Sequence, residues 1–295
     1  MLGKHLLGLY EKALPPWMDW ETRLRTAGEL GYDYVEISID EKDERIGRLY
    51  WDASKRKELH DAMAKTGISI PSMCLSCHRR FPYGSKDPAT RATAHELMEK
   101  AILFCREFGI RVIQLAGYDV YYEESTEESL QYFLEGLRSA ARLAEKYQVM
   151  LAMEIMDTPL MSSITRYKKY KDDIPSPWFT VYPDLGNLTA WGNDVKSELT
   201  LGIHEIVGVH LKDTLAVTPT FEGKFKCVTF GEGCVDFAGE MGILEELGYA
   251  GPYMMEMWYQ DGMDYVDYIT KAKNYIEEEF RKGVTEKDEI LSGTR

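Results

Sequence analysis

The sequence has 295 residues, of which 44% are hydrophobic, and a formal net charge of −14 from 35 basic and 49 acidic side chains. This acidic balance disfavours a nucleic-acid partner, and no apolar run approaches the roughly 18 residues of a membrane helix. The opening Met1-Leu-Gly-Lys-His does not resemble a signal peptide, so we expect a soluble, cytoplasmic protein with no membrane partner.

Short apolar runs alternate with amphipathic segments along the whole chain. The predicted strands cover residues 6–10, 34–39, 68–74, 111–115, 150–154, 179–182, 206–210 and 253–257. The predicted helices cover residues 17–30, 52–66, 89–108, 127–147, 163–171, 195–202, 237–247 and 263–281. Regular alternation of strand and helix is typical of a parallel sheet built from right-handed units, and eight such units form a (β/α)8 barrel. The predicted fold class is therefore α/β, a (β/α)8 TIM barrel.

A glycine separates several predicted helices from the strand that follows. It is present as Gly31, Gly67, Gly109 and Gly248, whereas Gln148 takes this place before the fifth strand. A glycine just past a helix adopts the left-handed conformation that ends the helix. These positions support the predicted boundaries.

No Pro-, Gly- or Ser-rich linker divides the chain, so we predict one domain over residues 1–295. The long connection of residues 213–236 follows the seventh strand, at the end of a barrel where active-site loops lie. We expect this loop to cover the mouth of the barrel and residues 282–295 to form a C-terminal tail.

The last four predicted strands each lead to a side chain that can bind a metal ion. These side chains are Glu154, Asp184, His210 and Glu256. Because barrel enzymes place catalytic groups at the carboxyl ends of their strands, we expect all four on one rim. Three carboxylates and an imidazole suit one divalent ion, Zn2+ or Mn2+ first and Co2+ or Mg2+ next. The ion would also relieve the repulsion among the carboxylates.

Each of these side chains taken singly also has an ordinary structural explanation. A polar group at the end of a strand can cap the next segment, or pair with Lys212, Arg166 or a backbone amide. The coincidence of four such residues on consecutive strands favours the metal site over this alternative.

The cysteines indicate neither a disulfide framework nor a thiolate metal site. Five are scattered along the chain, which fits a reducing compartment. Cys74 and Cys77 have zinc or redox spacing, but no second close pair completes a four-thiolate site.

Five motifs carry a resemblance to a known family. They are residues 71–82 (PSMCLSCHRRFP), 112–122 (VIQLAGYDVYY), 152–157 (AMEIMD), 182–187 (YPDLGN) and 230–233 (FGEG). With the fold pattern and ligand order, they resemble the xylose-isomerase-like barrel superfamily, and within it the L-xylulose-5-phosphate (L-ribulose-5-phosphate) 3-epimerases of L-ascorbate catabolism. The resemblance spans nearly the whole chain. It implies an isomerase, a metal-dependent carbohydrate epimerase that inverts C3 of a ketopentose 5-phosphate, with the four residues above as ligands.

The chemistry of this reaction suits two of the predicted ligands. Inverting a carbon next to a carbonyl requires a proton to leave one face and another to arrive on the opposite face. Glu154 and Glu256, on strands five and eight, would face each other across the rim, so we predict them as the acid/base pair. A metal ion would stabilise the enediolate between the two transfers. Asp184 and His210 are predicted as ligands only.

Phosphate recognition is predicted at the end of the third strand. His78 and Arg79 lie there, and arginine pairs well with phosphate. The alternatives are the backbone amides of residues 117–118 or 231–233. Arg79 and the adjacent Arg80 can also pair with acidic neighbours on a surface of this charge.

Contacts to the sugar are predicted from four further positions. Lys212 lies two residues past His210 and faces the same way along its strand. Glu36 and Gln114 lie on strands two and four, and Asn187 stands where related sugar epimerases carry a histidine.

Three other functions remain as alternatives to the 3-epimerase. A metal-dependent ketose–aldose isomerase would want a second metal and more ligands than the sequence offers. A DNA-repair endonuclease of the same barrel type would want more than six histidines and a basic groove. The last alternative is a non-catalytic sugar-binding protein. The expected partner is a small-molecule sugar phosphate, and a homodimer is the assembly considered.

Overall fold

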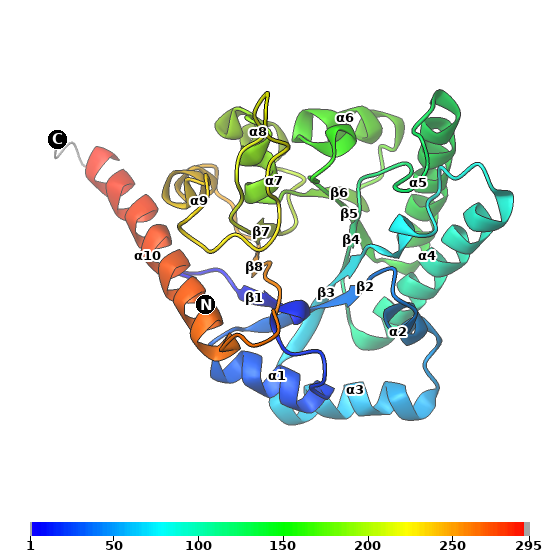
Figure 1. The fold of residues 1–295 in the computed structure, drawn as a ribbon, viewed down its shortest axis with the longest axis horizontal. Coiled ribbons are helices and arrows are strands. Elements are labelled where there is room, and N and C mark those ends of the chain that lie inside the picture. Colours follow the sequence, from blue (N-terminus) through cyan, green and yellow to red (C-terminus); the bar gives the residue numbers. More distant parts are fainter. Residues whose placement is uncertain (1, 292–295) are drawn as a thin grey trace.

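Eight parallel strands curve into a nearly closed barrel in the computed structural model, which describes residues 2–291 (Figure 1). The strands are β1 Leu7–Tyr10, β2 Tyr34–Ile39, β3 Ser69–Leu75, β4 Val112–Leu115, β5 Met150–Glu154, β6 Phe179–Tyr182, β7 Val209–Leu211 and β8 Tyr253–Met255. They pair in the order β6-β5-β4-β3-β2-β1-β8-β7. Two isolated parallel bridges, Val181 to Ile206 and Asp184 to His210, join the remaining edges. The predicted (β/α)8 architecture is confirmed.

The helices surround the ring of strands (Figure 1). They are α1 Trp20–Glu29, α2 Asp43–Ile46, α3 Ala53–Thr66, α4 Pro88–Phe108, α5 Glu127–Tyr147, α6 Ile164–Asp173, α7 Leu185–Ala190, α8 Val195–Gly202, α9 Phe237–Glu246 and α10 Tyr265–Leu291. Four 3-10 turns accompany them: η1 Glu11–Ala13, η2 Gly47–Tyr50, η3 Cys77–Arg79 and η4 Pro159–Met161. Within the described part of the chain, no helix has both the length and the apolar character needed to cross a membrane.

Left-handed residues end the helices where the sequence predicted them. Gly67 and Gly109 have φ of 71° and 73°, and their N–H groups donate to Met63 and Cys105 one turn earlier. Gln148 takes the same conformation after α5, with φ of 58°. These residues direct the chain from each helix into the next strand.

Several predicted boundaries were wrong: α1 begins at Trp20 rather than residue 17, β8 ends at Met255 rather than residue 257, and the largest differences are at β7 and α10. β7 covers Val209–Leu211 rather than residues 206–210, so His210 lies inside the strand. α10 runs to Leu291, past the predicted end at residue 281 and through much of the predicted tail; residues 292–295 lie outside the described part of the chain. Gly283 lies inside α10 where that helix packs closely on α9: a Cβ there would lie 2.2 Å from the Ala238 carbonyl oxygen.

Glycines inside the barrel leave room for tyrosine rings from neighbouring strands. A Cβ at Gly8 would lie 2.2 Å from the Tyr34 ring, and one at Gly208 would lie 2.6 Å from the Tyr182 ring. The Tyr34 hydroxyl donates to the Tyr253 carbonyl oxygen at 2.9 Å. Close packing of small against large residues therefore fills the barrel below its mouth and supports the groups above.

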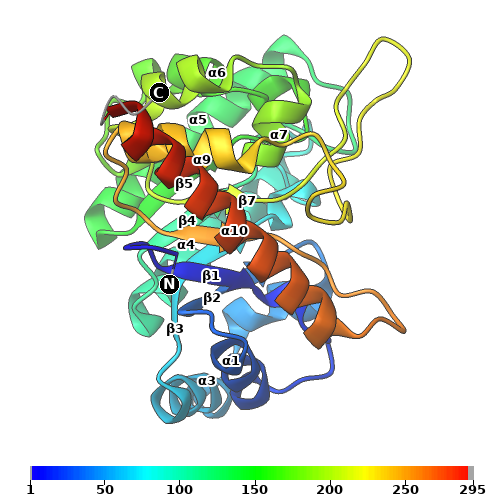
Figure 2. The same ribbon diagram turned by 90° about the vertical axis from the view of Figure 1, so that its left-hand side faces the viewer.

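The long connection after β7 extends on the side where the strands end. Figure 2 shows this loop (yellow) and the segment after β8 (orange) projecting to the same side of the barrel. Asp213 anchors the loop, because its Oδ2 accepts hydrogen bonds from the N–H groups of Gly231 and Gly233, both at 2.9 Å.

All five cysteines are free, which agrees with the absence of a disulfide framework expected from their odd number and scattered positions. Cys74, Cys77 and Cys105 are buried, and burial raises the pKa of each thiol. These side chains therefore contribute apolar packing.

A fully buried carboxylate after β1 holds three arginines together. Glu11 Oε1 accepts hydrogen bonds from Arg45 and from Arg48 Nη1 at 2.6 Å, and Oε2 lies 3.3 Å from Arg23 Nη1. Burial alone raises the pKa of Glu11, but the guanidinium groups of Arg48, Arg45 and Arg23 outweigh it and lower the pKa to about 2. The cluster ties the loop after β1 to α1 and to the loop after β2.

We expect Glu11→Gln to lower the free energy of unfolding by roughly 3 kcal/mol at pH 7, because lowering the pKa from 4.5 to about 2 corresponds to that energy. The folded state depresses this pKa, so the contribution is complete above pH 4.5 and is lost as the pH falls towards 2. Urea unfolding followed by circular dichroism should therefore show a smaller gap between wild type and variant at pH 3.5 than at pH 7.

The matched control is Glu21→Gln, which removes an exposed carboxylate paired with Arg25 and Lys65. Solvent screens this pair, so the substitution should have little effect at either pH. Equal losses in the two variants would contradict a special role for the buried cluster.

Candidate active site

Four potential metal ligands converge at the carboxyl ends of the strands. Glu154 ends β5, Asp184 is the N-cap of α7, His210 lies in β7, and Glu256 directly follows β8. All four are buried, and one ligand atom from each lies within 4.8 Å of all the others. The structure thus brings together the four side chains that the sequence analysis selected.

His210 Nδ1 lies at the centre of this group. It is 3.6 Å from Glu154 Oε1, 3.8 Å from Asp184 Oδ2 and 3.9 Å from Glu256 Oε2. Nitrogen and oxygen ligands arranged around one point are typical of a divalent metal site.

Strand pairing and helix capping set these positions. A parallel bridge joins Asp184 to His210, and the Glu256 N–H donates to the Leu211 carbonyl oxygen at 3.0 Å. Asp184 Oδ1 caps α7 by accepting the Asn187 N–H at 2.7 Å. The cap uses one carboxylate oxygen and leaves Oδ2 directed towards the other ligands.

Lys212 neutralises part of the acidic cluster. Its Nζ lies 3.0 Å from Asp184 Oδ2 and 2.9 Å from Glu256 Oε2. Neither oxygen has a well-aligned hydrogen bond to any described residue, despite the short distances to Lys212. Three carboxylates and one ammonium carry a formal charge of −3 + 1 = −2, which one divalent ion balances. The donor set and the charge therefore fit such an ion.

Burial and mutual charge shift the pKa values of the cluster. Burial, reinforced by Glu256, raises the pKa of Glu154 to about 7. Burial also favours a high pKa at Asp184, but Lys212 and His210 outweigh it, so that pKa lies below its usual value. For His210 the carboxylates, Glu36 foremost, overcome burial and raise the pKa. The raised pKa values of Glu154 and His210 mean that both groups hold a proton more readily than usual.

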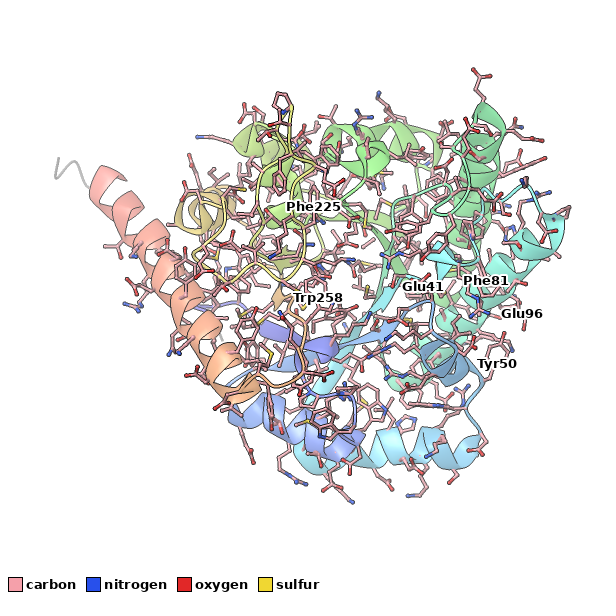
Figure 3. All side chains as sticks on the ribbon, in the orientation of Figure 1. Glu41, Tyr50, Phe81, Glu96, Phe225 and Trp258 are labelled. Carbon is pink, nitrogen blue, oxygen red and sulfur yellow. The ribbon has the colours of Figure 1, made fainter. Side chains whose placement is uncertain are left out.

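A polar pocket opens above the cluster. Its walls come from Tyr10, Lys12, Cys74, Ser76, Arg79, Glu154, Met156, Asp157, Asn187, Lys212, Lys226, Glu256 and Trp258. Figure 3 shows Trp258 near the centre of the molecule, with Phe225 of the long loop above it and Glu41 to its right. Lys226 comes from residues 213–236, so this loop contributes to the pocket as well as extending beside it.

Three of the five residues selected for substrate binding line the pocket, namely Arg79, Asn187 and Lys212. The other two lie elsewhere. His78 is buried away from the pocket, with Nε2 3.2 Å from the Ala94 carbonyl oxygen and its ring stacked on Tyr83. Gln114 is buried below the cluster, with Nε2 3.3 Å from His210 Nδ1.

Besides Glu256 Oε2, three buried atoms of the pocket residues have no hydrogen-bond partner among the described residues. They are Arg79 Nε, Asp157 Oδ1 and Asn187 Oδ1. An unpaired buried polar atom costs about 1–3 kcal/mol. One donor and two acceptors of this kind suit a ligand rich in hydroxyl groups.

Two of the other phosphate-binding groups considered from sequence, the glycines of residues 231–233 and Arg80, are already engaged. The N–H groups of Gly231 and Gly233 donate to Asp213. Arg80 is exposed and donates to Asp43 Oδ1 at 2.6 Å. Arg79 is therefore the candidate from this set that faces the pocket.

Sequence reasoning missed several pocket residues, including Tyr10, Lys12, Asp157 and Trp258. Tyr10 ends β1 and Trp258 lies two residues past Glu256, so the strand-end rule applied to every strand would have found both. No comparable signal marks Lys226, because it lies in the middle of a long loop.

Comparisons with known proteins agree with this architecture. The model of the family "Xylose isomerase-like TIM barrel" matches residues 24–282. SgbU of Escherichia coli (strain K12) is 54% identical over 276 residues, which cover 94% of this chain and 96% of that protein. The L-ribulose-5-phosphate 3-epimerase UlaE of Shigella boydii is 50% identical over 283 residues, covering 96% and 98%. The crystal structure of D-allulose 3-epimerase from Methylomonas sp. with D-allulose has a TM-score of 0.74 at 18% identity, covering 94% and 98%.

Divalent ions should raise the melting temperature of the protein, because an ion that binds only the folded state stabilises it, by about 2.7 kcal/mol at a hundred times its dissociation constant. Asp184→Asn keeps a capping side chain but removes one charged ligand, so it should lose most of this response. Thermal unfolding of chelator-treated protein with added Mn2+ or Zn2+ measures the effect.

Asp194→Asn is the control, since Asp194 caps α8 in the same way and is not one of the four ligands. It should retain the wild-type response. A wild-type protein indifferent to divalent ions, or an Asp184→Asn variant that responds fully, would contradict the metal site.

Proposed function

The chain belongs to the xylose isomerase-like TIM barrel family, and we propose that it interconverts L-xylulose 5-phosphate and L-ribulose 5-phosphate by inverting C3. The curated relative UlaE is an L-ribulose-5-phosphate 3-epimerase at 50% identity over nearly the full length of both chains, so this protein is an isomerase that acts as a sugar epimerase. The same relationship disfavours the ketose–aldose isomerase alternative. The structural observation that carries the proposal is the buried Glu154–Asp184–His210–Glu256 cluster at the base of a polar pocket.

The four clustered residues would hold the divalent ion that the charge balance calls for. When bound, the ion would supply Lewis-acid polarisation of the substrate carbonyl at C2. His210 would bind through Nδ1, the nitrogen nearest the three carboxylates. Zn2+ and Mn2+ are the ions that we propose first, because both accept mixed nitrogen and oxygen ligands.

Glu154 and Glu256 would carry out the proton transfers. They approach the cluster from β5 and from the end of β8, and both side chains line the pocket. With C3 of the sugar between them, one carboxylate would remove the proton from one face and the other would deliver a proton to the opposite face. The two glutamates would exchange these roles in the reverse reaction.

Lys212 would supply a fixed positive charge beside the reacting carbons. It is buried and held by Asp184 and Glu256, so it needs no rearrangement to face developing negative charge. A preorganised cation in a water-poor site stabilises an enediolate more effectively than solvent does.

The sugar hydroxyls and the phosphate would bind to separate parts of the wall. Asp157 Oδ1 and Asn187 Oδ1 would accept from hydroxyl groups that reach them. Lys12, Arg79 and Lys226 add positive charge to the pocket walls and suit the phosphate. Lys12 already pairs with Asp40 at 2.6 Å, and Arg79 Nη1 lies 3.6 Å from Glu41, which leaves Arg79 Nε available.

We expect Glu154→Gln and Glu256→Gln each to slow C3 proton exchange by at least about 10^2-fold, because an amide cannot act as the acid or base. Proton NMR of L-ribulose 5-phosphate in deuterated water measures the loss of the C3 signal. Circular dichroism checks that both variants remain folded.

Glu222→Gln, an exposed change in the long loop, should exchange at the wild-type rate. Wild-type exchange in either Glu154→Gln or Glu256→Gln would refute the paired mechanism. Deuterium appearing at C1 rather than C3 would instead indicate a ketose–aldose isomerase.

Replacing Arg79 by alanine should raise KM for L-ribulose 5-phosphate by roughly 10- to 100-fold, the value of a lost charge-assisted hydrogen bond. KM for unphosphorylated L-ribulose should change much less, because that sugar lacks the group that Arg79 is proposed to bind. Steady-state kinetics with both substrates measures the difference.

Arg80→Ala is the matched control, since Arg80 is the adjacent residue but pairs with Asp43 outside the pocket. It should leave both KM values nearly unchanged. Equal increases for the two sugars in Arg79→Ala would show that Arg79 only supports Tyr121, whose ring centroid lies 4.6 Å from its guanidinium carbon.

A further inference from the structure

Glu36 lies below the active site, on β2, and faces the imidazole of His210. Its side chain is fully buried, and Oε1 is 3.2 Å from His210 Nε2. Glu36 is absent from the pocket walls, so it is not in a position to contact the sugar as the sequence analysis expected. The group that it can act on is the histidine.

The surroundings of Glu36 differ from those of an ordinary structural carboxylate. Among the residues whose side chains the structure describes, His210 is its only ion-pair partner, and its Oε2 atom accepts no hydrogen bond. Glu11, which is equally buried, has three arginine partners instead. A buried carboxylate is costly unless it is paired, so the contact with His210 is the interaction that compensates for burying Glu36.

We propose that Glu36 is a positioning residue that fixes the metal-binding form of His210. By accepting the Nε2–H hydrogen bond, it keeps the proton on Nε2 and leaves Nδ1 unprotonated beside Glu154, Asp184 and Glu256, with Gln114 Nε2 also 3.3 Å away. This proposal rests on the metal-dependent function proposed above and deepens it.

Tyr182 completes the positioning of the ring. Its ring centroid lies 4.6 Å from that of His210, with 70° between the planes, so it restricts the tilt of the imidazole. Packing alone does not distinguish the two ring nitrogens, which have similar shapes. The hydrogen bond to Glu36 does distinguish them, and its negative charge also makes Nδ1 a stronger ligand.

Glu36→Gln tests this role, because glutamine keeps the shape and a hydrogen-bond acceptor but removes the charge. We expect the dissociation constant for Zn2+ to rise by about 10- to 100-fold, the usual effect of losing such a partner. Competition with a chromophoric chelator measures it. At saturating Zn2+, turnover should recover substantially, since Glu36 does not touch the substrate.

Glu240→Gln is the matched control. Glu240 is also buried, but its carboxylate contacts Thr189 and is not part of the ligand cluster. Its affinity for Zn2+ should stay within about twofold of wild type, a change of less than ~0.5 kcal/mol. Wild-type affinity in Glu36→Gln, or equal losses in both variants, would overturn the proposal.

A measurement on the wild-type protein decides the question even if Glu36→Gln does not fold. With 15N-labelled histidine, the imidazole that responds to Zn2+ should show the ion on Nδ1 and a proton on Nε2. An ion on Nε2, or an Nε2 without a proton, would overturn the proposal. If the wild-type protein binds no divalent ion, the proposed function itself fails; if it binds one and Glu36→Gln binds equally well, only the role of Glu36 fails.

Discussion

Repulsion among three buried carboxylates is the constraint on which the active site depends. Glu154, Asp184 and Glu256 offer oxygen atoms within 4.8 Å of one another, where water screens their charges poorly. Lys212 removes one unit of this charge and cannot remove more. The fold brings the acids together through strand pairing and a helix cap, interactions made by the backbone and by oxygens that do not face the cluster. The net negative charge that remains can therefore attract a divalent ion.

The sequence was sufficient to predict that the four candidate metal ligands lie together, because strand order converts directly into position. In a parallel barrel every strand ends at the same rim, so Glu154, Asp184, His210 and Glu256 could be grouped from their places after apolar runs. The same rule does not predict how deep in the barrel a side chain lies. Gln114 pairs with Ala152, two residues before Glu154, and therefore lies one layer below the mouth. Glu36 also lies in the layer beneath the pocket. Gln114 and Glu36, which were expected to contact the sugar, therefore contact His210 instead.

Side-chain direction in the loops was the part that the sequence did not determine. His78 and Arg79 are adjacent in η3, yet His78 stacks on Tyr83 while Arg79 lines the pocket. In a regular strand, alternation would assign such neighbours to opposite faces, but a short turn has no fixed period. The contribution of Lys226 depends in turn on how Asp213 anchors the long loop, a contact between segments about 20 residues apart. These features follow from tertiary packing, which local patterns do not contain.

Two of the four candidate metal ligands, Asp184 and His210, lie where the barrel is least connected. β6 and β7 share no continuous ladder and are joined by isolated bridges, one of which links Asp184 to His210. Gly208, just before β7, leaves space for the Tyr182 ring, so shape complementarity between side chains supplements the few backbone hydrogen bonds at this edge. Asp184 approaches the cluster from the end of β6, and His210 approaches it from β7. An ion bound by both residues would therefore link β6 to β7, where the backbone pairing is sparsest. The same ion would balance the charge of the carboxylates and close the barrel at this edge.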